Sequence, residues 1–100
     1  MAAKKNIGVI ECGKPGKSFA HHSMFQNQGT VTKLYVINEA YVNTCMKNFP
    51  GAELVQDKSN LLEDHSLDLI IISGCEKQEV HLAAEVLNAG KQVQLLTERV

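Results

Sequence analysis

The chain has 100 residues, 44% of them hydrophobic and 21% charged, with a formal net charge of -1 and a sequence pI of about 6.4. This length and composition predict one soluble globular domain, residues 1–100, with room for one core but not for a separate substrate domain. The near-neutral charge excludes the basic field that attracts nucleic acid or an anionic membrane. Neither a signal peptide nor a membrane span is recognisable, so we expect a cytoplasmic protein without nucleic-acid or membrane partners.

The first half of the chain predicts two strands and two helices. A short apolar run over Asn6–Ile10 ends in a loop rich in glycine and proline, which is typical of a buried strand. The pattern over residues 17–28 predicts a helix. Residues 31–37 are rich in β-branched and aromatic side chains and predict a second strand. Apolar residues at helical spacing over 41–49 predict a second helix, for which Asn38 is a suitable N-cap.

The second half predicts three more strands and two more helices. Residues 52–55 predict a short strand, and Ser59 is a suitable cap for a short helix over residues 59–65. Asp68–Ser73 is apolar on both faces, as in a central parallel strand covered by helices. Residues 76–89 predict a long helix, and residues 92–96 a fifth strand. The apolar stripe that we expect on the long helix comprises Val80, Ala83, Ala84 and Leu87.

The strand segments alternate with helical segments along the whole chain. Such alternation favours right-handed crossovers and a parallel sheet. We therefore expect an α/β fold, a Rossmann-like three-layer sandwich whose parallel sheet of about five strands has the order 3-2-1-4-5. In such a sheet a ligand binds in the crevice at the carboxyl ends of the first and fourth strands.

The loop after the first strand contains part of the Gly-x-Gly-x-x-Gly fingerprint of dinucleotide-binding proteins. Gly13 and Gly16 occupy its second and third glycine positions. Glu11 replaces the first glycine, and its carboxylate would repel a bound diphosphate by about 4 kcal/mol at ~4 Å and an effective dielectric near 20. Two alternatives stay open: Glu11 points away from the ligand, or the loop is a turn that binds none. The loop residues that we expect to bind NAD or NADP are Cys12, Gly13, Lys14, Pro15 and Gly16.

Polar or small residues also follow the second and fourth strands. Asn38 and Glu39 follow the second strand, where an acidic residue accepts hydrogen bonds from the ribose hydroxyls of a dinucleotide. An equally good interpretation is a helix cap followed by an acid in the first turn. Ser73 and Gly74 end the fourth strand beside the same crevice. We include all four among the predicted cofactor-binding residues.

The three cysteines, Cys12, Cys45 and Cys75, are odd in number and widely spaced, which argues against a disulfide framework and a zinc site. We therefore expect reduced thiols. Because Cys12 and Cys75 follow neighbouring strands of the expected sheet, a redox pair across the crevice is the alternative. His21 and His22 lack a matching carboxylate cluster, and no Ser-His-Asp or paired-carboxylate arrangement is recognisable. We predict neither a metal site nor a catalytic residue.

Three segments, residues 7–16, 66–73 and 80–93, together resemble the glucose-fructose oxidoreductase/inositol dehydrogenase (Gfo/Idh/MocA) family. The most specific part is Leu87–Val93, with the sequence Leu-Asn-Ala-Gly-Lys-Gln-Val. Members of this family bind NAD or NADP in an N-terminal Rossmann domain, and a C-terminal α/β domain supplies much of the substrate site. The resemblance spans nearly the whole chain and implies a Rossmann fold with a dinucleotide ligand.

The sequence departs from this family at the positions on which dehydrogenase chemistry depends. Asn38 stands where the family has an acid, and the family's histidine position falls near Glu79, with His81 displaced from it. The family's Glu-Lys-Pro motif after the fifth strand has no counterpart in residues 96–98, nor has its catalytic domain in residues 1–100. We therefore expect an NAD(P)-binding domain without autonomous dehydrogenase activity.

Two alternatives to this function stay open. One is a non-catalytic interaction protein that keeps the fold and has lost the cofactor, for which Glu11 is the main support. It would form a homodimer through the edge of the fifth strand or the adjoining helices, because an open sheet edge must be covered or paired. The other is a subunit that completes an oxidoreductase together with a separately encoded catalytic chain.

Overall fold

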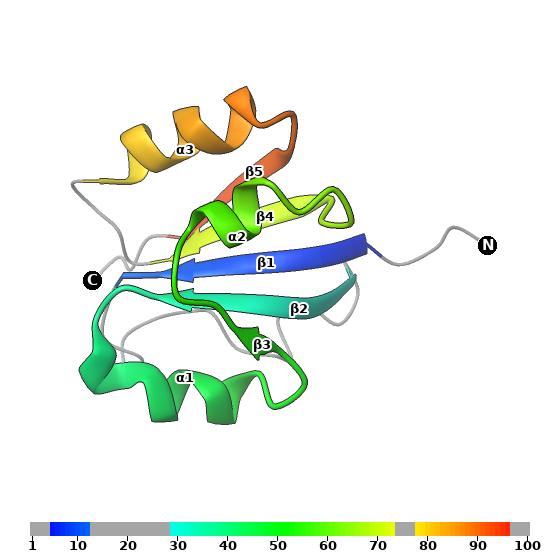
Figure 1. Ribbon diagram of the computed structural model, residues 1–100. Helices are drawn as coiled ribbons and strands as arrows, with labels where there is room; N and C mark the ends of the chain where they lie inside the picture. Colours follow the sequence, from blue (N-terminus) through cyan, green and yellow to red (C-terminus); the bar gives the residue numbers. More distant parts are fainter. Residues whose placement is uncertain (1–4, 13–28, 74–77, 97–100) are drawn as a thin grey trace.

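Figure 1 shows the computed structural model of the chain, which describes residues 5–12, 29–73 and 78–96. Its centre is a five-stranded, all-parallel sheet with the strand order β3-β2-β1-β4-β5. The strands are β1 (Lys5–Glu11), β2 (Gly29–Val36), β3 (Glu53–Leu54), β4 (Leu69–Ser73) and β5 (Gln92–Leu96). The expected Rossmann-like α/β fold and strand order 3-2-1-4-5 are therefore confirmed.

The described helices lie on both faces of this sheet (Figure 1). A 3-10 turn, η2 (Glu39–Tyr41), leads into α1 (Val42–Asn48) on one face, while α2 (Ser59–Leu62) and α3 (Glu79–Asn88) cover the other. The result is the three-layer arrangement that the sequence predicts. The helix expected over residues 17–28 lies outside the described residues, as do residues 76 and 77. None of the helices in the described ranges has the length and apolar character needed to cross a membrane.

Each face of the sheet has its own apolar core, because successive side chains of a strand point to opposite faces. Ile7 and Val9 of β1 pack in the core under α1, which we call the α1-side core. Ile10 packs in the core under α2 and α3, the α3-side core. All residues of β4 are buried, at most 5% exposed. This burial confirms β4 as a central strand covered on both faces.

The helices reach these cores through apolar side chains four residues apart. Cys45 of α1 and Phe49, which directly follows the helix, pack in the α1-side core, and each is 2% exposed. Leu82 and Val86 anchor α3 in the same way. The stripe expected on α3 is wrong in part: Ala83 packs against the core, but Val80 is 78% and Leu87 59% exposed. The α3 sequence contains two apolar stripes that overlap, and the one with Leu82 and Val86 faces the sheet.

Two glycines are required by the backbone. Gly29 begins β2 opposite Lys5, and a Cβ atom there would collide with the carbonyl oxygen of Lys5. Gly90 follows α3 with a φ of 81°, in the left-handed region that a side chain disfavours. The helix stop predicted at Gly90 is therefore confirmed, and its physical basis is this backbone conformation.

Candidate functional site

The carboxyl ends of β1 and β4 meet where the strand order reverses. From β1 the chain builds β2 and β3 on one side of the sheet and then β4 on the other. Glu11 is in register with Ser73, and the Cys12 backbone N–H donates to the Ser73 carbonyl oxygen at 2.9 Å. On the other side, the Ile37 N–H donates to the Glu11 carbonyl oxygen at 3.0 Å. These strand ends form one continuous rim, at the edge where open α/β sheets bind ligands.

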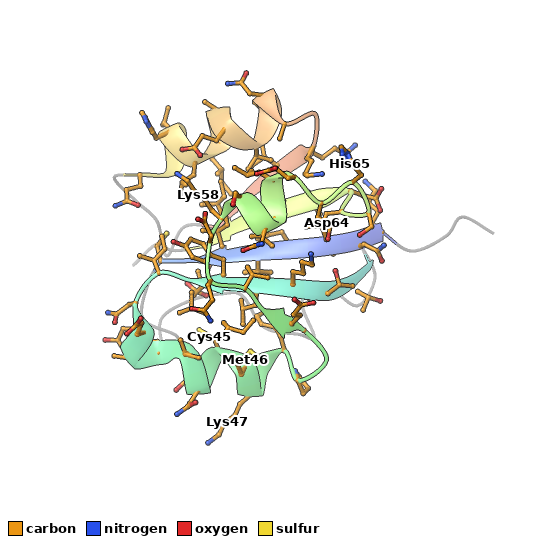
Figure 2. All side chains as sticks on the ribbon, in the orientation of Figure 1. Cys45, Met46, Lys47, Lys58, Asp64 and His65 are labelled. Carbon is orange, nitrogen blue, oxygen red and sulfur yellow. The ribbon has the colours of Figure 1, made fainter. Side chains whose placement is uncertain are left out.

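The Glu11 side chain is buried, only 2% exposed, at the last position of β1. Strand alternation places it on the same face as Ile7 and Val9, toward α1. Burial raises the pKa of the Cys45 thiol to about 11, and the negative charge of Glu11 adds to that rise. Figure 2 shows Cys45 on the sheet-facing side of α1, with Lys47 directed away. The Glu11 carboxylate thus lies within the α1 layer and is shielded from solvent at the rim.

Asn38 and Glu39 follow β2 at the same rim. The Asn38 Oδ1 atom accepts a hydrogen bond from the Ala40 N–H at 3.0 Å, so the helix-cap interpretation of Asn38 is confirmed. Glu39 is the first residue of η2 and is exposed. The amide oxygen of Asn38 is thus used locally, whereas the carboxylate of Glu39 faces solvent at the edge of the sheet.

A small hollow of about 160 Å³ lies beside Glu39, at the carboxyl ends of β2 and β3. Its lining is Tyr35, Val36, Ile37, Glu39, Val42, Leu54, Val55 and Gln56. Most of these residues are apolar, but Val36 and Val55 are buried, and the surface that faces the hollow is largely polar, with Glu39 as its acidic member. The hollow therefore presents mainly polar surface next to a carboxylate.

Several of the predicted site residues lie outside the described residues. These are Gly13, Lys14, Pro15, Gly16 and Gly74, together with Cys75, His21 and His22. Of the predicted set, the structure describes Cys12, Asn38, Glu39 and Ser73. Backbone pairing joins Cys12 and Ser73 directly, while Asn38 and Glu39 follow the neighbouring strand.

Cys12 is disulfide-bonded, so the expectation that all three thiols are reduced is wrong for this residue. Cys45 is free and buried. The sequence offers Cys75 as the remaining cysteine, and it lies outside the described residues.

A larger hollow of about 590 Å³ lies at the opposite, amino edge of the sheet, and it contains none of the predicted site residues. Its lysines already have partners. The Lys5 Nζ atom donates to the Gln92 side chain at 2.6 Å, and the Lys91 Nζ atom donates to the Asp64 carbonyl oxygen at 2.6 Å. Both lysines of this hollow therefore bind other groups of the chain, and we assign the candidate site to the carboxyl edge.

Two ion pairs that the sequence pattern does not predict connect elements on the α3 side. The Lys33 Nζ atom lies 2.7 Å from Asp64 Oδ2, and Lys58 Nζ lies 2.8 Å from Glu85 Oε1. The hydrogen bond from Lys33 holds the pKa of Asp64 well below its usual range, and hydrogen bonds from Ser66 lower it further. Figure 2 labels Lys58 and Asp64 near α2. Both pairs stabilise the packing around α2 and lie away from the rim.

A metal centre is not indicated in the part of the chain that the structure describes. Within residues 5–12, 29–73 and 78–96, no group of three or more His, Cys, Asp or Glu residues is placed to hold an ion. The described part of the rim consists of paired backbone, the exposed carboxylate of Glu39 and the disulfide-bonded Cys12.

The strand order and its reversal at this rim define a class of protein, the Rossmann-like α/β domains. No protein-family model and no curated protein matches the chain. Solved structures do match. GenD2 from gentamicin A biosynthesis, in complex with NAD, is similar with a TM-score of 0.76 and 18% identity, over 95% of this chain and 27% of its own.

Two further solved structures are similar over nearly the whole chain. Biliverdin reductase from Synechocystis, in complex with biliverdin and NADP+, has a TM-score of 0.72 and 22% identity, over 90% of this chain and 28% of its own. YPO2259 from Yersinia pestis, a candidate oxidoreductase, has a TM-score of 0.73 and 28% identity, over 95% of this chain and 27% of its own.

The chain spans 26–30% of the length of the solved chains it resembles. Its structural neighbours are oxidoreductases, and the resemblance to Gfo/Idh/MocA-type oxidoreductases is confirmed at the level of the fold. What the chain shares with them is the fold of this one α/β domain.

Proposed function

We propose that this chain is an NAD(P)-binding Rossmann domain that holds a dinucleotide at the rim of β1 and β4 and lacks autonomous dehydrogenase activity. The observation that carries the proposal is the backbone hydrogen bond from Cys12 to Ser73, which joins the two strand ends where the sheet order reverses. Gly13 follows Cys12 directly in the sequence. Two of the similar structures are complexes with NADP+ and with NAD, which supports a dinucleotide as the ligand.

Each residue of the proposed site has a role that follows from its chemistry. Gly13 allows the backbone to approach a pyrophosphate, Gly16 allows the following helix to pack close to the strand, and Lys14 supplies positive charge beside the pyrophosphate. Glu39 accepts hydrogen bonds from ribose hydroxyls, and Asn38 positions Glu39 by capping η2. The remaining members border the crevice with backbone and small side chains: Cys12, Pro15, Ser73 and Gly74.

We assign the dinucleotide to this edge of the sheet. The ends of β1 and β4 are joined there by paired backbone, and the hollow beside Glu39 lies at the same edge, next to an exposed carboxylate. When bound, the nicotinamide supplies a hydride donor or acceptor. This chain binds and orients that ring, and the groups that act on a substrate come from outside residues 1–100, for example from a separate catalytic chain.

Titration calorimetry with NAD+ and NADP+ on the reduced chain tests the proposal. Glu11→Gln removes the carboxylate charge with little change in shape, and we expect about tenfold tighter binding, ~1.4 kcal/mol. This is a fraction of the ~4 kcal/mol felt by two unit charges ~4 Å apart at an effective dielectric near 20. Glu39→Gln should weaken binding by about tenfold, through the lost charged acceptor. Absence of binding by all three proteins would refute the proposed function.

A second candidate function is that of a protein-interaction domain. It is favoured by exposed apolar side chains on α3 and on the edge strand β5. Val80 and Leu87 on α3 are 78% and 59% exposed, and Leu95 on β5 is 43% exposed. In the described sheet β5 is an edge strand, and such edges are commonly covered by another chain. This candidate function predicts a homodimer in solution.

A further inference from the structure

The two edges of the described sheet differ in length and chemistry. One edge is β3, a strand of two residues that includes the charged Glu53. The other edge is β5, five residues long, with the sequence Gln-Val-Gln-Leu-Leu. Short edge strands, charged side chains and prolines protect a sheet edge from pairing with another chain. β5 has none of these features, and no strand of the described sheet pairs with its outer side.

The outer side of β5 presents the backbone groups of Val93 and Leu95. The Gln92 N–H donates to the Asp68 carbonyl oxygen at 3.3 Å, so the backbone of Gln92 faces β4. The backbone groups of successive residues in a strand point to alternate sides, and those of Gln94 therefore face β4 as well. The N–H and C=O groups of Val93 and Leu95 point the other way, where a further strand would accept and donate hydrogen bonds.

The exposed apolar side of α3 faces in the same direction as this edge. α3 lies at the β5 end of the sheet, with α2 nearer to β1 (Figure 1). Glu85 of α3 points toward α2, since its Oε1 atom lies 2.8 Å from Lys58 Nζ. At ~100° per residue, Val80 and Leu87 lie roughly 140–160° around the helix from Glu85. Their exposed side chains are therefore on the side of α3 away from α2, which is the side of the open β5 edge.

This surface is complementary to itself about a two-fold axis through Gln94 and perpendicular to the sheet. In an antiparallel pair of β5 strands centred on Gln94, Val93 lies opposite the partner's Leu95, so the outward backbone groups of the two copies meet. Gln94 meets its own copy, and two neutral amides do not repel each other. These features favour a second copy of this chain as the occupant of the edge.

The same axis brings the two copies of α3 side by side. α3 lies against β4 and β5, so about two strand spacings, ~9.6 Å, would separate it from its copy. This distance is close to the roughly 8–10 Å between packed helices. Val80 would then contact the partner's Leu87, and the small residues Ala83 and Ala84 would lie at the centre, where the helices come closest.

The centre of the helix contact and the centre of the strand pair lie at the same level. Ala83 and Ala84 are on average ~7 Å from the C-terminal end of α3, at ~1.5 Å per residue. Gln94 is ~7 Å from the start of β5, at ~3.3 Å per residue. Because α3 ends and β5 begins at the same, amino edge of the sheet, one two-fold axis serves both contacts.

We propose that two copies of this chain pair through antiparallel β5 strands into one continuous sheet, with the two α3 helices packed across the axis. The proposal rests on the second candidate function, the protein-interaction domain, and it is independent of a bound dinucleotide. The homodimer buries the exposed side chains of Val80, Leu87 and Leu95 and pairs the open backbone of β5.

A charge at the centre of the helix contact tests the packing of α3. Ala84→Arg would place two positive charges beside the two-fold axis, so we expect the Kd of the dimer to rise at least about tenfold. His81→Arg is the matched control, because His81 is exposed on the same helix but lies only ~40° around it from Glu85, on the side toward α2. Its Kd should equal that of the native chain. Equal Kd values for native chain and Ala84→Arg, or equal weakening by both variants, would overturn this packing.

Amide hydrogen exchange, measured by NMR, tests the strand pair. We compare the native chain, at a concentration where ultracentrifugation shows a dimer, with monomeric Ala84→Arg. The N–H groups of Val93 and Leu95 should exchange at least about tenfold more slowly in the dimer. Gln94 is the internal control, because its N–H faces β4 in both states and should exchange at similar rates.

The outcomes separate the arrangement from the function on which it rests. A native chain that is monomeric at the concentration needed for NMR overturns both the strand pair and the second candidate function. A dimer in which Val93 and Leu95 exchange as fast as in the monomer overturns the β5 pair, whereas a homodimer through another surface stands. Neither result bears on the binding of NAD or NADP.

Discussion

The Glu11 side chain is packed in the folded protein, and its negative charge is unfavourable for a bound diphosphate. Its side chain is buried on the α1 side of β1, close enough to Cys45 for its charge to raise the pKa of that thiol. A glycine at this position would leave the space empty, so the residue has a packing role as well as an electrostatic one. The sequence indicated the replacement of the first glycine, but not the direction of the side chain, which depends on strand alternation.

Asp64 carries the acid sensitivity that we predict for the folded protein. Its pKa is held well below the usual range by Lys33 and Ser66, so the folded chain binds fewer protons than the unfolded chain in mild acid. This contribution to stability is present above the ordinary carboxyl pKa of 3.8 and is lost as the pH falls below it. Asp64→Asn should therefore be less stable than the native chain at neutral pH.

Urea unfolding of the native chain and Asp64→Asn, at neutral pH and in acid below 3.8, measures this contribution. The difference in the free energy of unfolding between the two proteins should shrink as the pH falls. Glu85→Gln breaks the other ion pair and is the matched control for loss of a surface charge. A difference for Asp64→Asn that stays constant across this pH range would contradict the assigned cause.

At the scale of elements, periodicity predicted which segments form strands and helices, and local hydrogen bonds decided where they end. The short helix expected over residues 59–65 stops at Leu62, because Asp64 instead accepts hydrogen bonds from the backbone and hydroxyl of Ser66. The inward face of α3 could not be predicted, since Leu82 and Val86 form an apolar stripe as regular as that of Val80 and Leu87.

The C-terminal end of α3 gives a prediction at this scale. Gly90 has a φ of 81°, which costs a residue with a side chain roughly 1–2 kcal/mol. Gly90→Ala should therefore lower the free energy of unfolding by about this amount, measured by urea denaturation. Gly51→Ala is the matched control, because a Cβ there meets nothing within 4 Å, and it should be neutral or slightly stabilising. Equal destabilisation by both changes would contradict this explanation of the helix stop.

For the whole molecule, the fold could be predicted because the predicted strands alternate with predicted helices along the sequence, and this alternation is typical of one parallel sheet. β4 was recognisable from its continuous apolar run, and that run placed the crevice beside β1. The site was predictable only in part. Cys12 and Ser73 come together as expected, but the cap role of Asn38 and the disulfide at Cys12 depend on contacts that sequence spacing left open.

The exposed apolar face of α3 and β5 gives a prediction about the whole molecule. A large apolar side chain contributes about 1.5–3 kcal/mol when it is fully buried, so a partner over Val80, Leu87 and Leu95 would be favoured. We expect analytical ultracentrifugation to show a dimer at high concentration. The double variant Val80→Lys and Leu87→Lys should be monomeric. The control variant Thr44→Lys, at an exposed position of α1, should have the same mass in solution as the native chain. A native chain that is monomeric at all concentrations would rule out this surface as a dimer interface.

The most direct test of the dinucleotide rim is the change in backbone amide NMR signals when NADP+ is added to the reduced, isotope-labelled chain. We expect the largest shifts at the carboxyl edge, for Glu11, Cys12, Glu39 and Ser73, with little change at the amino edge. No shifts at saturating NADP+, or the largest shifts around Lys5, Asp68 and Gln92, would contradict binding at this rim.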